Sequence, residues 1–267
     1  MSDRITTSKL EAMKTSGEKF VMVTAYDSTF ARLVSDAGAE CILVGDSLGM
    51  VLQGHDTTVP VSLEAMVYHT ECVARARPKS MIVADLPFMT YSSPEVALSA
   101  SMELMQQGAQ MVKLEGGTWL SDTIHQLVQR GIPVCAHLGL TPQSVNVFGG
   151  YRVMGRTPKE AKSILADAVE IQDAGASILL LECVPEELAA DISSKLDIPV
   201  IGIGAGAGTD AQVLVLHDLL GLTEKPAKFV ENFMEDADSI QDAIAAFVRA
   251  VKDLSLIHIS EPTRHRQ

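Results

Sequence analysis

Aromatic side chains are scarce in this chain: Phe, Trp and Tyr make up 4% of its 267 residues, with a single tryptophan. Hydrophobic residues nevertheless reach 47%, so an apolar core must be built mainly from Val, Leu, Ile, Ala and Met. Such a core is typical of a parallel sheet that is covered by helices. The composition therefore favours an α/β protein, and the length fits one α/β barrel domain.

Basic residues are in the minority. The chain has 21 Lys and Arg against 34 Asp and Glu, which gives a formal net charge of −13. A protein that binds nucleic acid or an anionic membrane surface needs a basic face. The acidic balance argues against both classes of partner, and we expect neither nucleic acid nor membrane to bind.

Long apolar runs and paired cysteines are also missing. No window approaches the ~20 apolar residues of a membrane-spanning helix, and the first twenty residues lack the apolar segment of a secretory signal peptide. The four cysteines, Cys41, Cys72, Cys135 and Cys183, form no C-x-x-C pair and lie in apolar segments. We therefore predict reduced core cysteines and a cytoplasmic location.

What the sequence does contain is a regular alternation of short apolar segments with segments of helical spacing. We predict eight strands, at residues 21–25, 41–45, 81–85, 111–115, 132–137, 177–182, 198–203 and 213–216. Helices are expected between most of them, with a short one before the first strand at 8–14 and an amphipathic one at 239–254. This pattern is that of a (β/α)₈ TIM barrel with a short N-terminal helix.

A doubly wound open sheet is the alternative architecture. Gly202, Gly204 and Gly206 resemble part of a dinucleotide-binding loop, but Ala207 breaks the G-x-G-x-x-G pattern. The segment also follows the seventh predicted strand instead of the first, where such a loop belongs. We expect a single TIM-barrel catalytic domain at 1–253, because residues 254–267 (LSLIHISEPTRHRQ) continue no pattern and look like a non-native tail.

Two charges interrupt the fourth predicted strand, Met111-Val-Lys-Leu-Glu115. Side chains alternate between the two faces of a strand, so Lys113 and Glu115 point the same way, into the interior of the barrel. Interior charges are costly unless they are paired or bound to a ligand. The two side chains are therefore either a buried ion pair or part of a functional site.

Carboxylates follow the ends of four predicted strands, at Asp46, Asp85, Glu115 and Glu182. Each one singly is explained equally well as a helix cap or a loop hydrogen-bonding group. The first three, however, end consecutive strands spaced about 4.8 Å apart, at the end of a barrel where active sites lie. Their mutual repulsion would be relieved by a cation, and an all-oxygen ligand set with room for water favours Mg²⁺ over Ca²⁺.

Enolisation of an α-keto acid suits such a site. A metal that is chelated by the substrate's carboxylate and carbonyl acts as a Lewis acid and stabilises the enolate. Lys113, two residues before Glu115, is placed to neutralise the substrate carboxylate or the enolate oxygen. Glu182 follows three leucines, 179–181, and apolar surroundings would raise its pKa into the range of a general base.

Seven motifs follow one another along the chain: VGDSLGM (44–50), QGHDTT (53–58), ADLPFM (84–89), VKLEGG (112–117), HLGLTPQS (137–144), LECVP (181–185) and IGIGAG (201–206). Together they resemble the motifs of the ketopantoate hydroxymethyltransferase family. The motifs occur in order, and the resemblance extends from about residue 5 to 253. A series of this length is far more specific than a single glycine pattern.

The resemblance implies a TIM-barrel enzyme of pantothenate biosynthesis that binds Mg²⁺ and assembles as a homodecamer. The implied reaction moves a hydroxymethyl group from 5,10-methylenetetrahydrofolate to 3-methyl-2-oxobutanoate, which gives 2-dehydropantoate. By position, the resemblance implies metal ligands at Asp46, Asp85 and Glu115. It further implies keto-acid contacts at Asp46, Ser47, Asp85 and Lys113, and a proton acceptor at Glu182.

Two other functions are compatible with these residues. A carbon–carbon lyase of the phosphoenolpyruvate/isocitrate-lyase type shares the enolate strategy, but would favour a cysteine acid on a mobile loop; the longest irregular stretch, 139–157, is a candidate lid without Cys. A metal-stabilised barrel without catalytic activity is the other alternative. His137 is a weaker candidate for a substrate contact or a structural role, and His55 and His217 are interpreted as structural or supporting residues.

Overall fold

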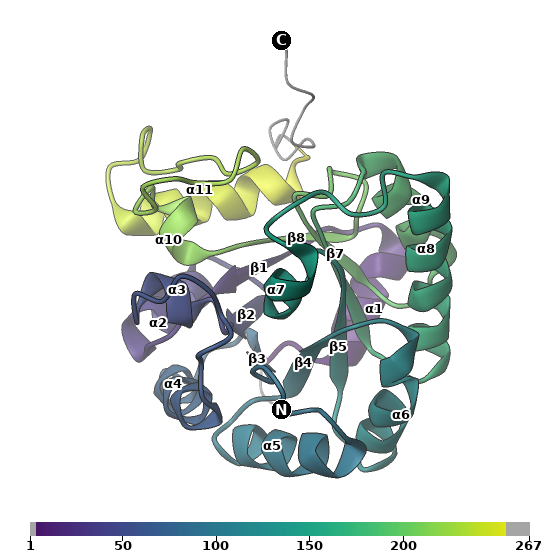
Figure 1. Ribbon diagram of the computed structural model, residues 1–267. Helices are drawn as coiled ribbons and strands as arrows, with labels where there is room; N and C mark the ends of the chain where they lie inside the picture. Colours follow the sequence, from purple (N-terminus) through teal and green to yellow (C-terminus); the bar gives the residue numbers. More distant parts are fainter. Residues whose placement is uncertain (1–3, 255–267) are drawn as a thin grey trace.

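The computed structural model describes residues 4–254 of the chain, which form a closed barrel of eight parallel strands (Figure 1). Each strand pairs with the next one in the sequence, and β8 pairs with β1 to close the ring. The predicted (β/α)₈ barrel is therefore confirmed, and the open doubly wound sheet is wrong. The predicted tail at 254–267 lies, apart from Leu254, outside the described residues.

The strands are short and almost entirely buried, as expected for a parallel sheet with one face inside the barrel and the other under helices. They are β1 (Phe20–Thr24), β2 (Cys41–Val44), β3 (Met81–Asp85), β4 (Met111–Glu115), β5 (Val134–Gly139), β6 (Ile178–Glu182), β7 (Val200–Ile203) and β8 (Ala211–Leu214). Most of these bounds lie within two residues of the predicted ones.

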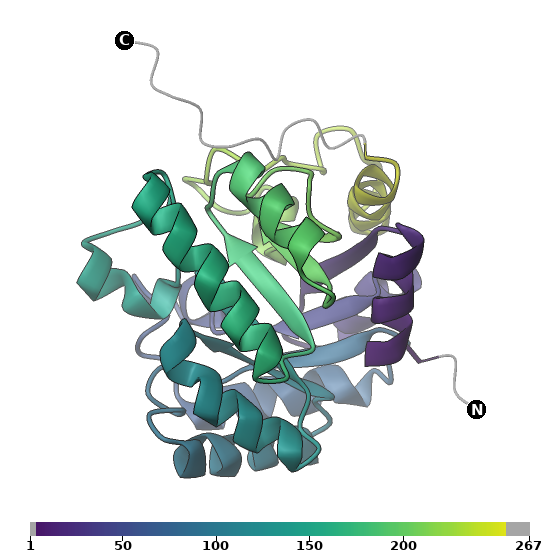
Figure 2. The same cartoon turned by 90° about the vertical axis from the view of Figure 1, so that its right-hand side faces the viewer.

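Helices surround the barrel, and Figure 2 shows α8 and α9, in green, packed along its outer side. The longer helices are α1 (Thr7–Ser16), α2 (Ser28–Asp36), α4 (Leu63–Arg75), α5 (Pro94–Gln106), α6 (Ser121–Gln129), α8 (Pro158–Asp173), α9 (Glu186–Lys195) and α11 (Ile240–Lys252). The short ones are α3 (Leu48–Val51), α7 (Val145–Phe148) and α10 (Leu216–Leu219), with 3₁₀ turns η1 (Thr118–Leu120) and η2 (Pro142–Ser144).

The predicted N-terminal helix is α1, and it packs at the N-terminal end of the barrel. The Thr6 side chain caps its first turn, and Gly17 ends it in the left-handed conformation with φ of 74°. Leu10 is buried, and Lys14 Nζ lies 2.7 Å from Asp210 Oδ2 at the start of β8. An apolar contact and a fixed ion pair therefore hold α1 in place.

Two predicted segments differ from the structure. The eighth strand begins at Ala211 instead of residue 213, and the pair expected at its end, His217-Asp218, lies in α10. The sequence did not predict this start, because Gln212 places a polar side chain in the strand. Its buried amide donates to oxygens of the β7–β8 loop. The irregular stretch 139–157 contains η2 and α7, so it is partly helical, and its role as a lid stays a prediction.

All four cysteines are free, and three of them are buried in the core, as predicted. Cys72 is half-buried on α4. Within residues 4–254, no helix has both the length and the apolar character that are needed to cross a membrane.

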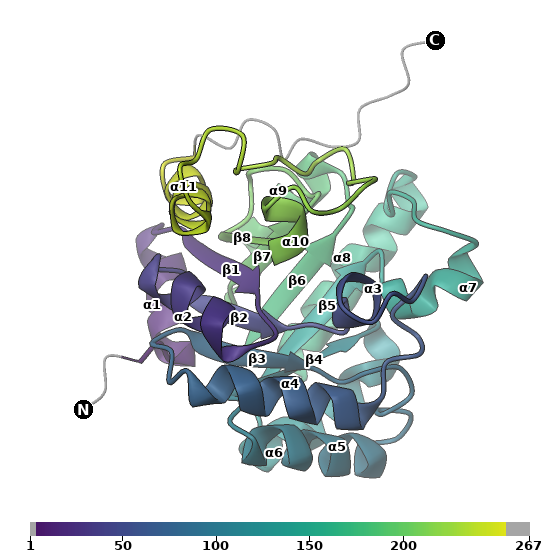
Figure 3. The same ribbon diagram turned by 90° about the vertical axis from the view of Figure 1, so that its left-hand side faces the viewer.

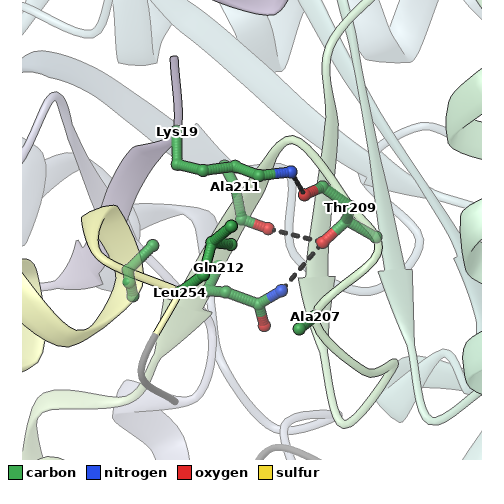
Figure 4. Close-up of a pocket in the computed structure, with 7 residues that line it drawn as sticks. Lys19, Ala207, Thr209, Ala211, Gln212 and Leu254 are labelled. Carbon is green, nitrogen blue, oxygen red and sulfur yellow. Dashed lines mark hydrogen bonds between the residues drawn. The ribbon is translucent and has the colours of Figure 1, made fainter. Parts of the chain in front are cut away.

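Two cavities lie at opposite ends of the barrel. The one at the N-terminal end has a volume of about 10 Å³, room for about one water molecule, and is enclosed by Lys19, Thr209 and Gln212 among others (Figure 4). The second has a volume of about 900 Å³ and includes residues from the C-terminal ends of most strands. Only the second has room for a substrate.

Candidate active site

The large cavity contains every residue that the sequence analysis assigned to a site: Asp46, Ser47, Asp85, Lys113, Glu115 and Glu182. The short helices α3, α7 and α10 come after β2, β5 and β8 and lie around this end of the barrel (Figure 3). The structure thus gathers these residues at the C-terminal end of the strands, where barrel enzymes carry their active sites.

Strand register decides which of these side chains are neighbours. Asp85 is the register partner of Lys113, Glu115 of His137, and Gly139 of Glu182. Lys113 and Glu115 do share the inner face of β4, as alternation predicts. Neighbouring strands therefore present a continuous row of charged and polar groups to the cavity.

Lys113 pairs across the sheet more closely than along its own strand. Its Nζ lies 2.8 Å from Asp85 Oδ1 and 3.6 Å from Glu115 Oε1, and its side chain is 4% exposed. Burial alone would lower the pKa of Lys113, but the charges of Asp85, Glu115 and Asp46 hold it well above its ordinary value. The shorter ion pair is therefore with Asp85, whereas the sequence suggested one with Glu115.

Asp46 lies two residues beyond β2, beside Asp85. Its backbone N–H donates to Asp85 Oδ2 at 2.9 Å. Burial raises the pKa of Asp46 well above its ordinary value, and the charges of Asp85 and Glu115 raise it further. One lysine thus faces three carboxylates, an excess of negative charge that a bound cation would balance.

Glu115 is the best stabilised of the three acids. Its Oε1 lies 3.2 Å from His137 Nδ1, and its Oε2 accepts from the Gln143 N–H at 3.0 Å. Burial would raise the pKa of Glu115, but His137 and Lys113 outweigh burial and lower it. Glu115 therefore stays charged while Asp46 does not readily do so.

Glu182 stands apart from this group, at the end of β6. Burial, followed by the charge of Glu115, raises its pKa from 4.5 to about 8. Its Oε2 lies 3.4 Å from His137 Nε2. The expected rise in the pKa of this carboxyl, and burial as its cause, are both present in the structure.

His137 lies between the two glutamates, with Nδ1 toward Glu115 and Nε2 toward Glu182. Burial lowers its pKa, so the ring is neutral at pH 7 and carries one N–H. If Nδ1–H donates to Glu115, Nε2 is left as an acceptor; it has no hydrogen-bond donor among residues 4–254. His137 thus connects the acid group to Glu182, and His55 is exposed on the cavity wall.

The position of Glu182 also depends on a glycine in the neighbouring strand. Gly139, at the end of β5, has φ of 90°, and a Cβ there would lie 2.2 Å from the Glu182 carbonyl oxygen. No side chain fits at this distance, and the left-handed conformation also favours glycine. The backbone of β5 therefore approaches the backbone of Glu182 directly.

Gln143 is a site residue that sequence reasoning missed. Its amide Nε2 donates to Asp46 Oδ2 at 2.8 Å and to the Leu86 carbonyl at 3.0 Å, and its Oε1 accepts from the Tyr91 hydroxyl. The side chain is 4% exposed. Together with its N–H to Glu115, Gln143 links two of the three grouped acids. The only signal was its place in the HLGLTPQS motif.

Ser47 is held by an aromatic residue from the adjacent strand region. Its Oγ lies 2.9 Å from the hydroxyl of Tyr26, which follows β1 and is buried. Ser47 precedes α3 without capping that helix through its side chain. Its hydroxyl is therefore oriented by Tyr26 and remains on the cavity wall.

The acid group has the chemistry of a Mg²⁺ site. Within the described part of the chain, no three His, Cys, Asp or Glu side chains converge closely enough to enclose a metal ion directly. The available donors are nevertheless carboxylate oxygens, and Asp85 Oδ1 lies 2.8 Å from the Lys113 ammonium and has no further hydrogen-bond partner within residues 4–254. Mg²⁺ usually binds through one or two carboxylates and keeps several waters, so this donor set fits it.

Comparison with known proteins gives a consistent result. The profile of the family described as ketopantoate hydroxymethyltransferase matches residues 4–256. The chain is 56% identical over 253 residues to 3-methyl-2-oxobutanoate hydroxymethyltransferase 2 of Pseudomonas entomophila, covering 94% of this chain and 95% of that protein. It is 57% identical over 250 residues to the 3-methyl-2-oxobutanoate hydroxymethyltransferase of Marinobacter nauticus, covering 93% and 94%.

Solved structures share the barrel at much lower identity. Phosphonopyruvate hydrolase in complex with oxalate and Mg²⁺ has a TM-score of 0.61 and 14% identity, covering 80% of this chain and 81% of that one. A 2,3-dimethylmalate lyase of the PEP mutase/isocitrate lyase superfamily has a TM-score of 0.59 and 16% identity, covering 93% and 97%. At these identities the likeness shows the fold alone.

Proposed function

Because the chain belongs to the ketopantoate hydroxymethyltransferase family, we propose that its large cavity converts 3-methyl-2-oxobutanoate into 2-dehydropantoate. The one-carbon donor is 5,10-methylenetetrahydrofolate, which leaves as tetrahydrofolate, and the product serves pantothenate biosynthesis. The observation that carries this proposal is the pairing of a raised-pKa carboxyl, Glu182, with a separate group of acids and Lys113 in one cavity.

Asp46, Asp85 and Glu115 are the residues that would hold Mg²⁺, directly or through water. A metal bound there would supply Lewis-acid stabilisation of the negative charge that develops on the substrate carbonyl. Gln143 and the Asp46 backbone N–H already fix the carboxylates relative to one another. The protein therefore holds its ligands in a defined arrangement before the substrate binds.

The keto acid is proposed to contact Asp46, Ser47, Asp85 and Lys113. Lys113 lies among the acids at the ends of β2 to β4, so its ammonium offers the charge that a substrate carboxylate requires. The Ser47 hydroxyl, oriented by Tyr26, is a hydrogen-bonding group for a substrate oxygen. Binding would draw Lys113 partly away from Asp85 and free that carboxylate for the metal.

Glu182 is proposed as the base that removes the proton from C3 of the keto acid. The C3–H bond breaks, the proton moves to the Glu182 carboxylate, and the electron pair forms the enolate. Water adds to the methylene carbon of the donor, both C–N bonds break, and the two nitrogens take up the protons of that water, which gives tetrahydrofolate and one-carbon aldehyde. C3 of the enolate then forms a bond to this carbon, and the aldehyde oxygen takes the proton from Glu182 to become the hydroxyl of the new hydroxymethyl group. A base with a pKa near neutrality is well matched to this step, and the protonated carboxyl that results lies 3.4 Å from the acceptor nitrogen of His137, Nε2.

The other functions considered are less well supported. The lyase alternative shares the fold, but high identity links the chain to hydroxymethyltransferases, and the segment at 139–157 contains no cysteine acid. A barrel without catalytic activity would have no need of a carboxyl whose pKa is raised beside a charged group in a large cavity.

We further propose that residues 1–253 are one catalytic domain that assembles as a homodecamer and works in the cytoplasm. The assembly is supported by family resemblance, and the location by four free cysteines. The net charge of −13 supports the absence of a nucleic-acid partner. Light scattering coupled to size-exclusion chromatography tests the decamer, and a stable monomer would contradict it.

The reaction is tested by incubating the protein with 3-methyl-2-oxobutanoate, 5,10-methylenetetrahydrofolate and Mg²⁺. We expect 2-dehydropantoate and tetrahydrofolate in equal amounts. A second measurement, deuterium exchange at C3 of the keto acid without the donor, isolates enolisation. Folded protein that forms no product and exchanges no C3 proton would overturn the proposed function.

A further inference from the structure

The large cavity has far more room than the keto acid and its metal require. Its volume is about 900 Å³, at the upper end of the ~300–1,000 Å³ typical of sites for drug-sized ligands. The proposed keto-acid site occupies the side formed by β2 to β5, and Glu182 stands on β6. The remaining side is formed by β8, α10 and residues 220–229.

This second wall contains one buried aromatic ring. Phe229 is 7% exposed and lies against the end of β7, where a Cβ on Gly204 would come within 2.8 Å of its ring. Gly204 has φ of 58°, so glycine is required both by the backbone and by the ring. Val213, Val215 and Leu222 add apolar surface to the same wall. The wall thus presents apolar side chains to the cavity, a surface suited to a flat ring.

One carboxylate on this wall is sheltered. Three acids line the cavity away from the Lys113 group and Glu182, and of these Asp56 and Glu224 are exposed. Asp218 is half-buried, and its Oδ1 accepts from the Thr223 hydroxyl at 2.5 Å. Burial raises the pKa of Asp218, which shows that its carboxylate lacks full solvation. It is the acid on this wall that has most to gain from a ligand.

Asp218 also faces the reaction site. It lines the same cavity as Glu182, and its negative charge adds to the rise in the pKa of Glu182 and of Tyr26. Next to it, His217 packs against Tyr26, with ring centroids 5.8 Å apart, and its Nδ1 has no hydrogen-bond partner within residues 4–254. A sheltered carboxylate and an unpaired ring nitrogen therefore sit together beside an apolar wall.

We propose that this wall is the pterin site of the folate donor, with Asp218 binding the N3–H and 2-amino edge of the ring. The inference rests on the proposed function, which supplies the donor. These two N–H groups lie side by side on the pterin, and they match the two oxygens of one carboxylate in a bidentate, charge-assisted pair. The flat ring covers the apolar wall, and the methylene group attached to it then faces the base on β6.

The proposal is tested with Asp218→Asn, because an amide keeps the size of the side chain and the Thr223 contact but loses the charge and one acceptor. We expect the affinity for tetrahydrofolate, measured by calorimetry, to fall by about 10- to 100-fold, the range for charge-assisted hydrogen bonds. The KM for 5,10-methylenetetrahydrofolate should rise by a similar factor. Deuterium exchange at C3 of the keto acid, which needs no donor, should stay within about two-fold of wild type.

Asp173→Asn is the matched control, because it makes the same chemical change at an exposed acid at the end of α8 that does not line the cavity; it should leave the affinity for tetrahydrofolate unchanged. Unchanged affinity in Asp218→Asn would overturn the pterin site, and so would a fall in C3 exchange as large as the fall in turnover. If wild-type protein exchanges no C3 proton, the proposed function fails instead, while the binding measurement still decides the role of Asp218.

Discussion

Asp210 at the N-terminal end of the barrel and Asp85 at the C-terminal end each face one lysine, at 2.7 Å and 2.8 Å. Asp210 Oδ2 also accepts from the Ser193 hydroxyl and from the Val200 N–H, so this carboxylate joins α1, α9, β7 and β8. Asp85 shares its lysine with Glu115 and Asp46. The same pair of residue types therefore closes the barrel at one end and leaves charge unbalanced at the other.

The two ends of the barrel also differ in cavity volume and in the partners of their buried acids. At the N-terminal end, Glu40 accepts from the Val21 N–H and pairs with Lys252 of α11, and the cavity at this end has a volume of only about 10 Å³. At the C-terminal end, the acids surround about 900 Å³. Buried groups that are saturated stabilise a fold, whereas buried charges that lack partners destabilise it until a ligand arrives. Structural and functional acids are therefore distinguished by their hydrogen-bond and ion-pair partners, and not by burial itself.

The largest effect should come from Glu182→Gln, which removes the proposed base but keeps its shape. We expect C3 proton exchange and turnover to fall by ~10²–10⁴-fold, the usual range for a general base, with little change in keto-acid affinity. Exchange is measured by NMR in deuterium oxide. Glu187→Gln, an exposed glutamate on α9, is the control and should behave like wild type. Exchange at the normal rate in Glu182→Gln would show that another group is the base.

Glu182→Gln should lower activity but raise the stability of the fold at higher pH. The pKa of Glu182 is about 8 in the folded protein against an ordinary 4.5, so between these pH values the folded state holds a proton that the unfolded chain has lost. Stability from this group is present below pH 4.5 and is lost as the pH rises through 8.

Without metal or substrate, Glu182→Gln should therefore become more stable than wild type as the pH rises from 5 to 8. The difference should reach a few kcal/mol, since one pKa unit corresponds to about 1.4 kcal/mol. Urea unfolding at several pH values gives the free energy of unfolding for both proteins. Parallel pH profiles would contradict the raised pKa, and Glu187→Gln again serves as the control.

Asp85→Asn and Asp210→Asn test the two ends directly. Asp85→Asn should weaken Mg²⁺ binding by about 100-fold or more, because changes to supporting groups alone cost ~10–100-fold. Asp210→Asn should lower the free energy of unfolding by ~1–3 kcal/mol through lost charge-assisted bonds and leave the Mg²⁺ affinity unchanged. Calorimetry with Mg²⁺ alone, together with urea unfolding, separates the two outcomes. Equal loss of Mg²⁺ affinity in both variants would contradict the assignment of Asp85 to a metal site and of Asp210 to a structural role.

The smallest effect is expected for the two buried glutamines. Gln143→Leu removes the amide between Asp46 and the Leu86 carbonyl, and we expect about 10-fold weaker Mg²⁺ binding because one ligand loses its orientation. Gln212→Leu removes a comparable amide at the N-terminal end and should cost a similar ~1–3 kcal/mol of stability without affecting Mg²⁺. If Gln143→Leu bound Mg²⁺ normally, Gln143 would be a structural residue like Gln212.

Much of this site could be predicted from the sequence, because the alternation of side chains within a strand and the order of the strands depend on residues close together in the chain. The inner face of β4 follows from the spacing of Lys113 and Glu115, and apolar neighbours predict the raised pKa of Glu182. Alternation cannot predict register, however. The register of β3 against β4 sets Asp85 beside Lys113, and this is why the closer ion pair is the cross-strand one.

Other features depend on contacts between distant segments. Gln143 reaches Asp46 across 97 positions, and Tyr91 reaches Gln143 across 52, so no periodicity reveals either contact. Gln212 hides the start of β8 because its polar amide finds partners only once the β7–β8 loop has folded over it. The sequence thus predicts which side chains point into the barrel, whereas their hydrogen-bond partners are set by tertiary packing.

Gly139 has a consequence for efforts to alter the specificity of this enzyme. It is not among the residues that line the cavity, so a library directed at the cavity wall would leave it unchanged. Any side chain at this position would meet the Glu182 carbonyl oxygen and displace the strand that carries the proposed base. Random mutagenesis should therefore find position 139 as intolerant as the reacting residues, and a screen that scores only loss of activity would mistake a spacing requirement for a chemical one.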